Sequence, residues 1–228
     1  EAGEEFKKTI FRPSRKDYLI SHPVYTDDEL SSVIYTHKNV KGISDSVAYL
    51  AVKLLRSGFD FFTGYGFQNF NETMWLRRML FLETVAGVPG MVGGMARHMR
   101  SLRRMKRDHG WINTLLQEAE NERMHLLTFM QLRSPGPLFR AMVLITQGIV
   151  FNAFFVAYLI SPRTCHYFVG YLEEEAVKTY SHAIEDIKAG RLPEWENKLA
   201  PEIALKYWKT PDRKSTRLTP VTVRYRMP

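Results

Sequence analysis

A glutamate and a histidine in the middle of the chain have the spacing of metal ligands. Glu122 and His125 are three residues apart in the segment Glu120-Asn121-Glu122-Arg123-Met124-His125. On an α-helix this spacing turns the chain by about 300°, so both side chains project from one face. A carboxylate and an imidazole directed at one point are half of a di-iron carboxylate site, which needs a Glu from each of two helices and a Glu-x-x-His from each of two others. One such motif alone more often marks a solvated helix face, so the other ligands must be found elsewhere in the chain.

Acids on two other expected helices could supply further ligands. Glu83 is a single acid in an apolar turn of a helix expected over about 72–106. Glu173 opens the run Glu173-Glu174-Glu175, in which three successive acids cannot all point inward, so one is a ligand candidate and the others are expected to be solvated. Iron favours such a mixture of carboxylate and imidazole, and buried acids without a metal would carry a large desolvation cost. We therefore predict that these acids and the motif above form one metal site.

The apolar pattern predicts an all-α protein with a single core. Helices are expected over 44–62, 72–106, 111–132, 141–160, 165–189 and 201–208. They make up one helical domain over 44–208, between an N-terminal extended arm over 1–43 and a basic C-terminal tail over 209–228. Ser44 or Asp45 is expected to cap the first helix, and an apolar stripe follows its helical period (Val47, Leu50, Ala51, Leu54 and Leu55). Gly87, Gly90 and Gly94 follow Glu83 at helical spacing and favour close packing of another helix.

The run from residue 141 to residue 160 carries no charge and is bounded by Arg140 and Arg163. Twenty such residues could span a bilayer. Three polar residues interrupt the run (Thr146, Gln147 and Asn152), and no second span is evident. A helix that lies in the membrane interface, or one buried in the bundle, fits the pattern equally well.

Charge and cysteine content narrow the classes of partner and compartment. Of the net charge of +8, a share of +5 lies in residues 209–228, which hold six Lys or Arg against one Asp. This charge favours an anionic partner such as membrane lipid; no aromatic-basic binding motif supports nucleic acid, which we do not expect as a partner. The only cysteine, Cys165, excludes an internal disulfide and fits a reducing compartment or the inside of an organelle. Because the first residue is Glu1, we expect a processed chain whose targeting peptide has been removed.

Three segments resemble the alternative oxidases, the cyanide-insensitive ubiquinol oxidases of mitochondria. They are residues 82–95 (LETVAGVPGMVGGM), 121–125 (NERMH) and 171–176 (YLEEEA), and the resemblance runs in order from about residue 45 to residue 208. It implies a ferritin-like di-iron helical bundle that binds to the matrix side of the mitochondrial inner membrane as a monotopic, often dimeric protein. The counterpart of residues 141–160 lies in the membrane interface. The activity it implies is reduction of O2 to water with electrons from ubiquinol.

The resemblance also assigns roles to individual residues. The residues that match iron ligands are Glu83, Glu122, His125 and Glu173. Tyr180 matches a redox-active tyrosine beside the metals, and would be catalytic in an active enzyme. The residues that match the quinone-binding site are Arg56, Asp60, Arg78, Leu82 and Thr179.

The chain departs from the family pattern at its C-terminal end. The family's fourth bundle helix carries a second Glu-x-x-His shortly after the segment that resembles Tyr207-Trp208. None of the seven histidines here follows His182, and only His125 has a Glu three residues before it. Two of six iron ligands are therefore expected to be absent, and the bundle is expected to be incomplete because its fourth helix is missing. The incomplete site would hold one metal or none.

These observations leave two hypotheses. The first is an alternative-oxidase-like protein of the mitochondrial inner membrane that is catalytically impaired and serves as a structural subunit of a larger respiratory-chain assembly. Because an incomplete bundle exposes an apolar face, that face would be covered by other respiratory-complex subunits, by a second copy in a homodimer, or by the chain's own arm and tail. The alternative is an active di-iron ubiquinol oxidase. Under either hypothesis ubiquinol remains a candidate ligand.

Overall fold

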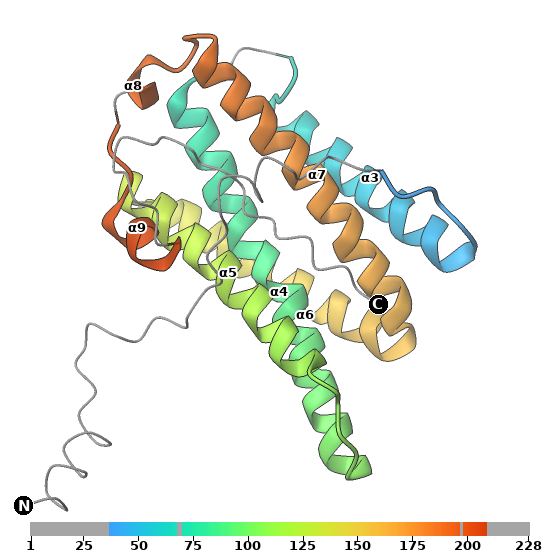
Figure 1. Ribbon diagram of the computed structural model, residues 1–228. Helices are drawn as coiled ribbons and strands as arrows, with labels where there is room; N and C mark the ends of the chain where they lie inside the picture. Colours follow the sequence, from blue (N-terminus) through green and yellow to red (C-terminus); the bar gives the residue numbers. More distant parts are fainter. Residues whose placement is uncertain (1–36, 68–69, 197, 209–228) are drawn as a thin grey trace, which may run out of the picture.

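The protein, described by a computed structural model over residues 37–67, 70–196 and 198–208, consists in that part of the chain of helices joined by short connections. In chain order the helices are α3 (Ile43–Thr63), α4 (Glu72–Arg104), α5 (Trp111–Leu132), α6 (Pro137–Ile160), α7 (Pro162–Lys188), α8 (Pro193–Glu196) and α9 (Glu202–Trp208) (Figure 1). The prediction of an all-α fold is confirmed. The short helix α8 has no counterpart in the sequence-based expectation. The arm over 1–36 and the tail over 209–228 lie outside the described residues.

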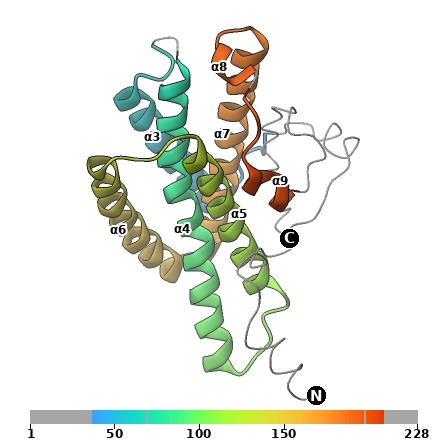
Figure 2. The ribbon, with the colours of Figure 1, turned by 90° about the vertical axis from the view of Figure 1, so that its left-hand side faces the viewer.

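Helix α4 is central to the arrangement. It forms a long antiparallel hairpin with α5, packs against α6 on another side and touches α7 (Figures 1 and 2). Helix α3 packs against α7, and the short α9 lies against α5. The three helices that carry the predicted ligands, α4, α5 and α7, therefore run past one another in the middle of the molecule.

Helix α3 begins differently from the prediction. Gly42 occupies the N-cap position with φ of 85°, and no side chain caps the helix. The capping role expected of Ser44 or Asp45 is therefore wrong. Asp45 is buried and instead accepts hydrogen bonds from the backbone N–H of Lys41 at 2.8 Å and the hydroxyl of Tyr171 at 2.7 Å. The second bond joins the start of α3 to α7. A buried carboxylate needs hydrogen-bond donors, and Tyr171 of α7 supplies one of them.

The apolar stripe of α3 faces outward. Leu50 and Leu54 are 59% and 64% exposed, whereas Ala48 and Val52 turn inward and pack with Tyr171 of α7. Small residues face α7, so the two helices lie close together while the larger aliphatic side chains are left uncovered. An exposed row of this kind marks a surface that meets lipid or another protein.

Two helices, α4 and α6, are long and apolar enough to cross a bilayer, by length and composition alone. Half of the apolar window of α4 is buried inside the protein, which is the behaviour of a core helix, whereas only 11% of that of α6 is buried. The exposed residues of α6 include Leu144, Ile145, Ile149, Leu159 and Ile160. α6 nevertheless contacts α4 along one side, where Phe154 and Tyr158 pack with Val92.

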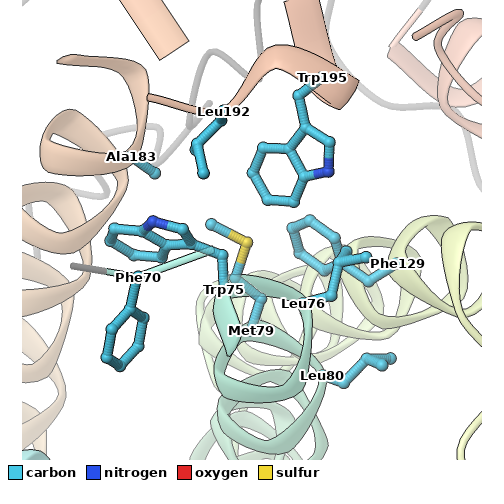
Figure 3. Packing of buried hydrophobic residues seen from close by; sticks show 9 residues of the cluster. All are labelled: Phe70, Trp75, Leu76, Met79, Leu80, Phe129, Ala183, Leu192 and Trp195. Atoms are coloured by element: carbon cyan, nitrogen blue, oxygen red, sulfur yellow. The ribbon is translucent and has the colours of Figure 1, made fainter. Parts of the chain in front are cut away.

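The main hydrophobic core lies at one end of the bundle, where α8 folds back over α4, α5 and α7. Its buried members are Phe70, Trp75, Leu76, Met79, Leu80, Phe129, Ala183, Leu192 and Trp195 (Figure 3). Leu192 and Trp195 come from the segment around α8. Burial of these two large apolar side chains over the ends of the longer helices stabilises this short helix. The metal-ligand candidates lie beyond this core, toward the middle of the same helices.

The glycine row on α4 is the contact surface for α5. A Cβ atom built on Gly90 would lie 2.7 Å from the carbonyl oxygen of Leu115 and 3.1 Å from the backbone nitrogen of Ala119. One on Gly87 would lie 3.4 Å from the carbonyl oxygen of Ala119. The prediction of close helix packing is confirmed: the two backbones approach so closely that no side chain fits at the crossing.

We predict that Gly90→Ala destabilises the protein. Alanine gains up to ~1 kcal/mol of helix propensity, but its methyl group would push α4 and α5 apart at a backbone contact, and such overpacking costs about 1–3 kcal/mol. Thermal unfolding followed by circular dichroism should show a lower midpoint. Gly170→Ala is the matched control, because Gly170 lies within α7 with open space where its Cβ would stand, and it should leave the midpoint unchanged or raise it. A Gly90→Ala variant as stable as Gly170→Ala would contradict the prediction.

Candidate metal centre

Glu83 of α4 and the pair Glu122 and His125 of α5 converge on one point. Their ligand atoms all lie within 4.8 Å of one another. The Nδ1 atom of His125 is 3.6 Å from a carboxylate oxygen of each glutamate. Glu83 and Glu122 are 5% and 7% exposed. Glu122 and His125 thus project from one face of α5, as their spacing predicted. The close crossing of α4 and α5 brings Glu83 opposite them.

Glu173 of α7 lies near the same group. It is half-buried, and the charges of Glu122 and His125 act on its carboxyl group. Burial, together with the charge of Glu122, raises the pKa of Glu173 to about 8. The three ligands from α4 and α5 form the compact group, and Glu173 stands next to it without belonging to it. Its two neighbours do not behave as expected: neither Glu174, which bonds His37, nor the buried Glu175, which bonds Lys53, is simply solvated.

A fourth acid, Glu118, belongs to the same surroundings and was not predicted. It lies one turn before Glu122 on α5 and is half-buried. Burial, and then the charges of Glu173 and Glu122, raise its pKa to about 8. The spacing of four and seven residues from Glu122 and His125 places it on their face of the helix, and this spacing could have identified it in the sequence.

The buried acids and the histidine shift one another's pKa values. Burial, and then the charge of Glu83, raise the pKa of Glu122 to about 7. Burial alone would lower the pKa of His125, but the nearby carboxylates of Glu122 and Glu83 outweigh burial and raise that pKa to about 10. Without a cation, the group therefore holds protons at neutral pH on both the imidazole and part of the carboxyl set.

Two aromatic residues complete the surroundings. The Tyr180 hydroxyl on α7 donates a short hydrogen bond to Oε1 of Glu83, and burial raises the pKa of Tyr180 well above its ordinary value, with the charge and hydrogen bond of Glu83 as further causes. Trp208 of α9 stacks on His125 with ring centroids 5.1 Å apart and an interplanar angle of 16°. No residue spacing in the sequence predicts the Trp208 contact, because it depends on how α9 folds back over α5.

The donor set fits a metal ion. Within the described part of the chain, the buried Oε2 atom of Glu83 has no hydrogen-bond partner, since His125 Nδ1 at 3.6 Å is beyond hydrogen-bond range. An unsatisfied buried carboxylate oxygen is costly. A cation bound there by carboxylate oxygens and an imidazole nitrogen would remove that cost, and this donor mixture suits iron.

The residues expected at a quinone also come together, beside the metal ligands. Arg56 of α3 donates to Asp60 at 2.6 Å and to the Thr179 hydroxyl at 2.7 Å. Arg78 of α4 is almost fully buried and forms a close ion pair with Asp60. We call Arg56, Asp60, Arg78 and Thr179 the polar cluster. Leu82 follows Arg78 by one turn on α4 and is half-buried, so it shares that face of the helix.

A helical fold that brings buried carboxylates and an imidazole together is the arrangement of proteins with carboxylate-type metal sites. Comparison with known proteins identifies the particular family: the model of the alternative oxidase family matches residues 25–226. The mitochondrial alternative oxidase of Emericella nidulans is 59% identical over 207 residues, which cover 86% of this chain and 58% of that protein. Those of Ajellomyces capsulatus and Aspergillus niger are 52% and 57% identical, and cover 92% and 84% of this chain and 64% and 57% of those proteins. The chain belongs to the alternative oxidase family.

This length difference bears on the second Glu-x-x-His. The chain spans about three-fifths of the curated relatives it matches. The hypothesis of impaired catalysis depended on the absence of two ligands from these 228 residues. Because the relatives are longer, that absence carries no conclusion about activity, and the hypothesis stays a prediction.

We predict that binding of a divalent cation releases more than one proton per ion at pH 7. His125, with a pKa of about 10, must lose its proton to bind, and a cation lowers the raised pKa values of Glu122 and Glu173. The apparent affinity should therefore rise with pH between neutrality and about 10. Titration with ferrous iron under argon in weak buffer, with a pH indicator, measures the protons released.

Glu122→Gln should lower both the affinity and the proton count. Glu120→Gln is the matched control, because Glu120 pairs with Arg123 on another face of α5, and it should change neither. A titration of the unmodified chain that releases no protons would contradict the assignment.

Proposed function

We propose that this protein is a mitochondrial ubiquinol oxidase that reduces dioxygen to water at an iron centre held in part by Glu83, Glu122, His125 and Glu173. The observation that carries the proposal is the convergence of buried carboxylates and one imidazole on a point where a carboxylate oxygen lacks a partner. Membership in the alternative oxidase family supports it. Bound iron supplies the electron transfer and the binding of dioxygen.

The polar cluster is the proposed site for the quinol head group. It offers guanidinium donors and a hydroxyl, and Asp60 between the two arginines can accept a hydrogen bond from a quinol hydroxyl. Phe61 and Phe62 directly follow Asp60 and are 69% and 87% exposed. A lipid-soluble quinol can thus approach over apolar surface and meet polar groups only at its ring oxygens.

Helix α7 joins the two sites. Thr179 belongs to the polar cluster, and the next residue, Tyr180, donates to the metal ligand Glu83. Because its pKa is raised, Tyr180 keeps its hydroxyl proton at neutral pH. It is placed to hold that proton beside the centre and to give it up when charge there changes. We therefore assign it the role of a catalytic tyrosine.

The exposed apolar faces support a place at a membrane surface. α6 leaves most of its apolar residues uncovered, and α3 presents its row of Leu and Phe side chains. Both helices contact the core along one side, so a monotopic position in the matrix leaflet of the mitochondrial inner membrane satisfies the exposed faces without a span. Membrane lipid is thus a proposed partner.

We predict that the iron-loaded protein in liposomes oxidises ubiquinol with dioxygen uptake that cyanide does not inhibit. Glu122→Gln should lower turnover at least ~100-fold, since loss even of a residue that supports a metal ligand typically costs 10–100-fold. An oxygen electrode measures the rate. Glu120→Gln should retain full activity.

Absence of turnover in the unmodified, iron-loaded chain would reject the oxidase and favour the second candidate, a structural subunit of a respiratory-chain assembly. That candidate has one observation of its own: Met91, Met95 and Met99 form an exposed row along α4, which a second copy or another subunit could cover. Stable association with a respiratory complex, without iron, would then be the expected finding.

We further predict different effects for two neighbouring residues of α7. Tyr180→Phe should keep iron binding and the quinol KM but lower kcat about 100-fold, because it removes a positioned proton donor. Thr179→Val should mainly raise KM, roughly 3- to 10-fold, because it removes a hydrogen bond to Arg56 worth about 0.5–1.5 kcal/mol. Steady-state kinetics over a range of quinol concentrations separate the two. Equal effects on kcat would refute the division of roles.

A further inference from the structure

A chain of hydrogen-bonding groups leads from the polar cluster to the protein surface. Tyr65, in the turn after α3, places its hydroxyl 2.7 Å from Nδ1 of His182 on α7. The other ring nitrogen of His182, Nε2, lies 3.5 Å from Oδ1 of Asp186, one turn further along α7. The side chain of His182 is 46% exposed. This end of the chain of groups is therefore open to solvent.

Tyr65 also borders the polar cluster. The guanidinium of Arg78 lies over its ring, 4.1 Å from the centroid, and that of Arg56 lies 5.2 Å away. The same phenol thus faces the proposed quinol site and contacts the exposed histidine. Burial raises the pKa of Tyr65, although the charges of Arg56 and Arg78 act in the opposite direction, so the phenol stays neutral.

The surroundings hold the histidine in one orientation. Trp75 packs edge-on against both Tyr65 and His182, with centroids 5.7 Å and 5.6 Å apart. Its Nε1–H donates to Oδ2 of Asp186 at 3.1 Å, and Arg191 donates to Oδ1 at 2.9 Å. Because the Asp186 carboxylate attracts the Nε2 proton of His182, the Nδ1 atom is left as the acceptor for the Tyr65 hydroxyl.

We propose that Tyr65, His182 and Asp186 form a proton relay that carries protons from quinol oxidation to solvent. The proposal rests on the proposed oxidase function. As a quinol O–H bond breaks, its proton passes to the Tyr65 oxygen, and the proton that Tyr65 held passes to Nδ1 of His182. The imidazolium gives its Nε2 proton to water at its exposed edge, while Asp186 stabilises its charge. Proton exchange with water then returns the neutral ring from the Nδ1–H to the Nε2–H tautomer, so His182 can accept again. The electrons leave the quinol for dioxygen, so the step releases a proton without leaving charge on Tyr65.

The relay would carry the proton away from the positive charge of the polar cluster. Arg56 and Arg78 would repel a proton that stayed beside them, and Asp60 is already paired with both. Tyr65 and His182 offer the proton a route that ends away from the two guanidinium groups. In this relay Tyr65 would touch the substrate, whereas His182 and Asp186 act through it.

The first test is turnover of the iron-loaded full chain carrying His182→Ala. The rate should fall roughly 10- to 100-fold. This loss is at or below the usual effect of removing a positioned acid or base, because water can replace part of the relay. Added imidazole should restore part of the rate, and the solvent deuterium isotope effect should increase. The matched control is His98→Ala, which removes an exposed histidine of α4 outside both sites and should show none of these changes.

Tyr65→Phe is the second variant, because it keeps the aromatic packing against Trp75 while it removes the hydroxyl. It should lower turnover without response to imidazole. The tautomer gives a readout that does not need turnover: ¹⁵N NMR of the Zn²⁺-substituted protein should show His182 protonated at Nε2, with an Nδ1 resonance that shifts in Tyr65→Phe.

The outcomes separate the two proposals. Unmodified protein that oxidises no quinol overturns the oxidase and the relay together. An active protein in which His182→Ala turns over normally, or is not rescued by imidazole, overturns the relay alone. A neutral His182 protonated at Nδ1 would also overturn it, because that tautomer cannot accept the Tyr65 proton.

Discussion

The burial of several carboxyl groups at one point, among the helices α4, α5 and α7, is the constraint on which the rest of the structure depends. Carboxylates cannot remain charged together in an apolar interior without compensating positive charge. In the protein alone, compensation comes from the proton on His125 and from protonation of part of the acid set, which is why these pKa values are raised. A bound cation would replace those protons, so metal binding at this group would release protons.

Several features elsewhere serve to maintain this arrangement. The glycines of α4 let α5 approach until Glu83 meets Glu122 and His125, and a single methyl group at Gly90 would separate the two backbones. Tyr180 satisfies one oxygen of Glu83, and Trp208 covers His125 with a stacked indole ring. The core under α8 holds the ends of the same helices. Packing in several parts of the protein thus offsets the free-energy cost of burying the charged ligands.

Helix α7 connects two kinds of chemistry because neighbouring residues on a helix point in different directions. Thr179 turns to the guanidinium groups of the polar cluster, whereas Tyr180 turns to the carboxylate of Glu83. One turn of the same helix later, the half-exposed His182 meets Tyr65, and the buried Asp186 follows His182 by a further turn. In the proposed mechanism, electron transfer and proton movement would therefore be separated in space, while a single helix fixes the distance between the two sites.

Periodicity and local spacing predicted the helices other than α8, the resemblance to the alternative oxidases and the ligand pair Glu122 and His125, because a helix converts residue spacing directly into geometry. Contacts between distant segments could not be predicted in this way. Asp45 looked like a helix cap but is buried against Tyr171, the leucines of α3 face outward, and Trp208 stacks on His125. Each of these depends on which helix lies opposite, and only the tertiary structure decides that, since the same amphipathic pattern can turn its apolar side to a core, a membrane or a partner.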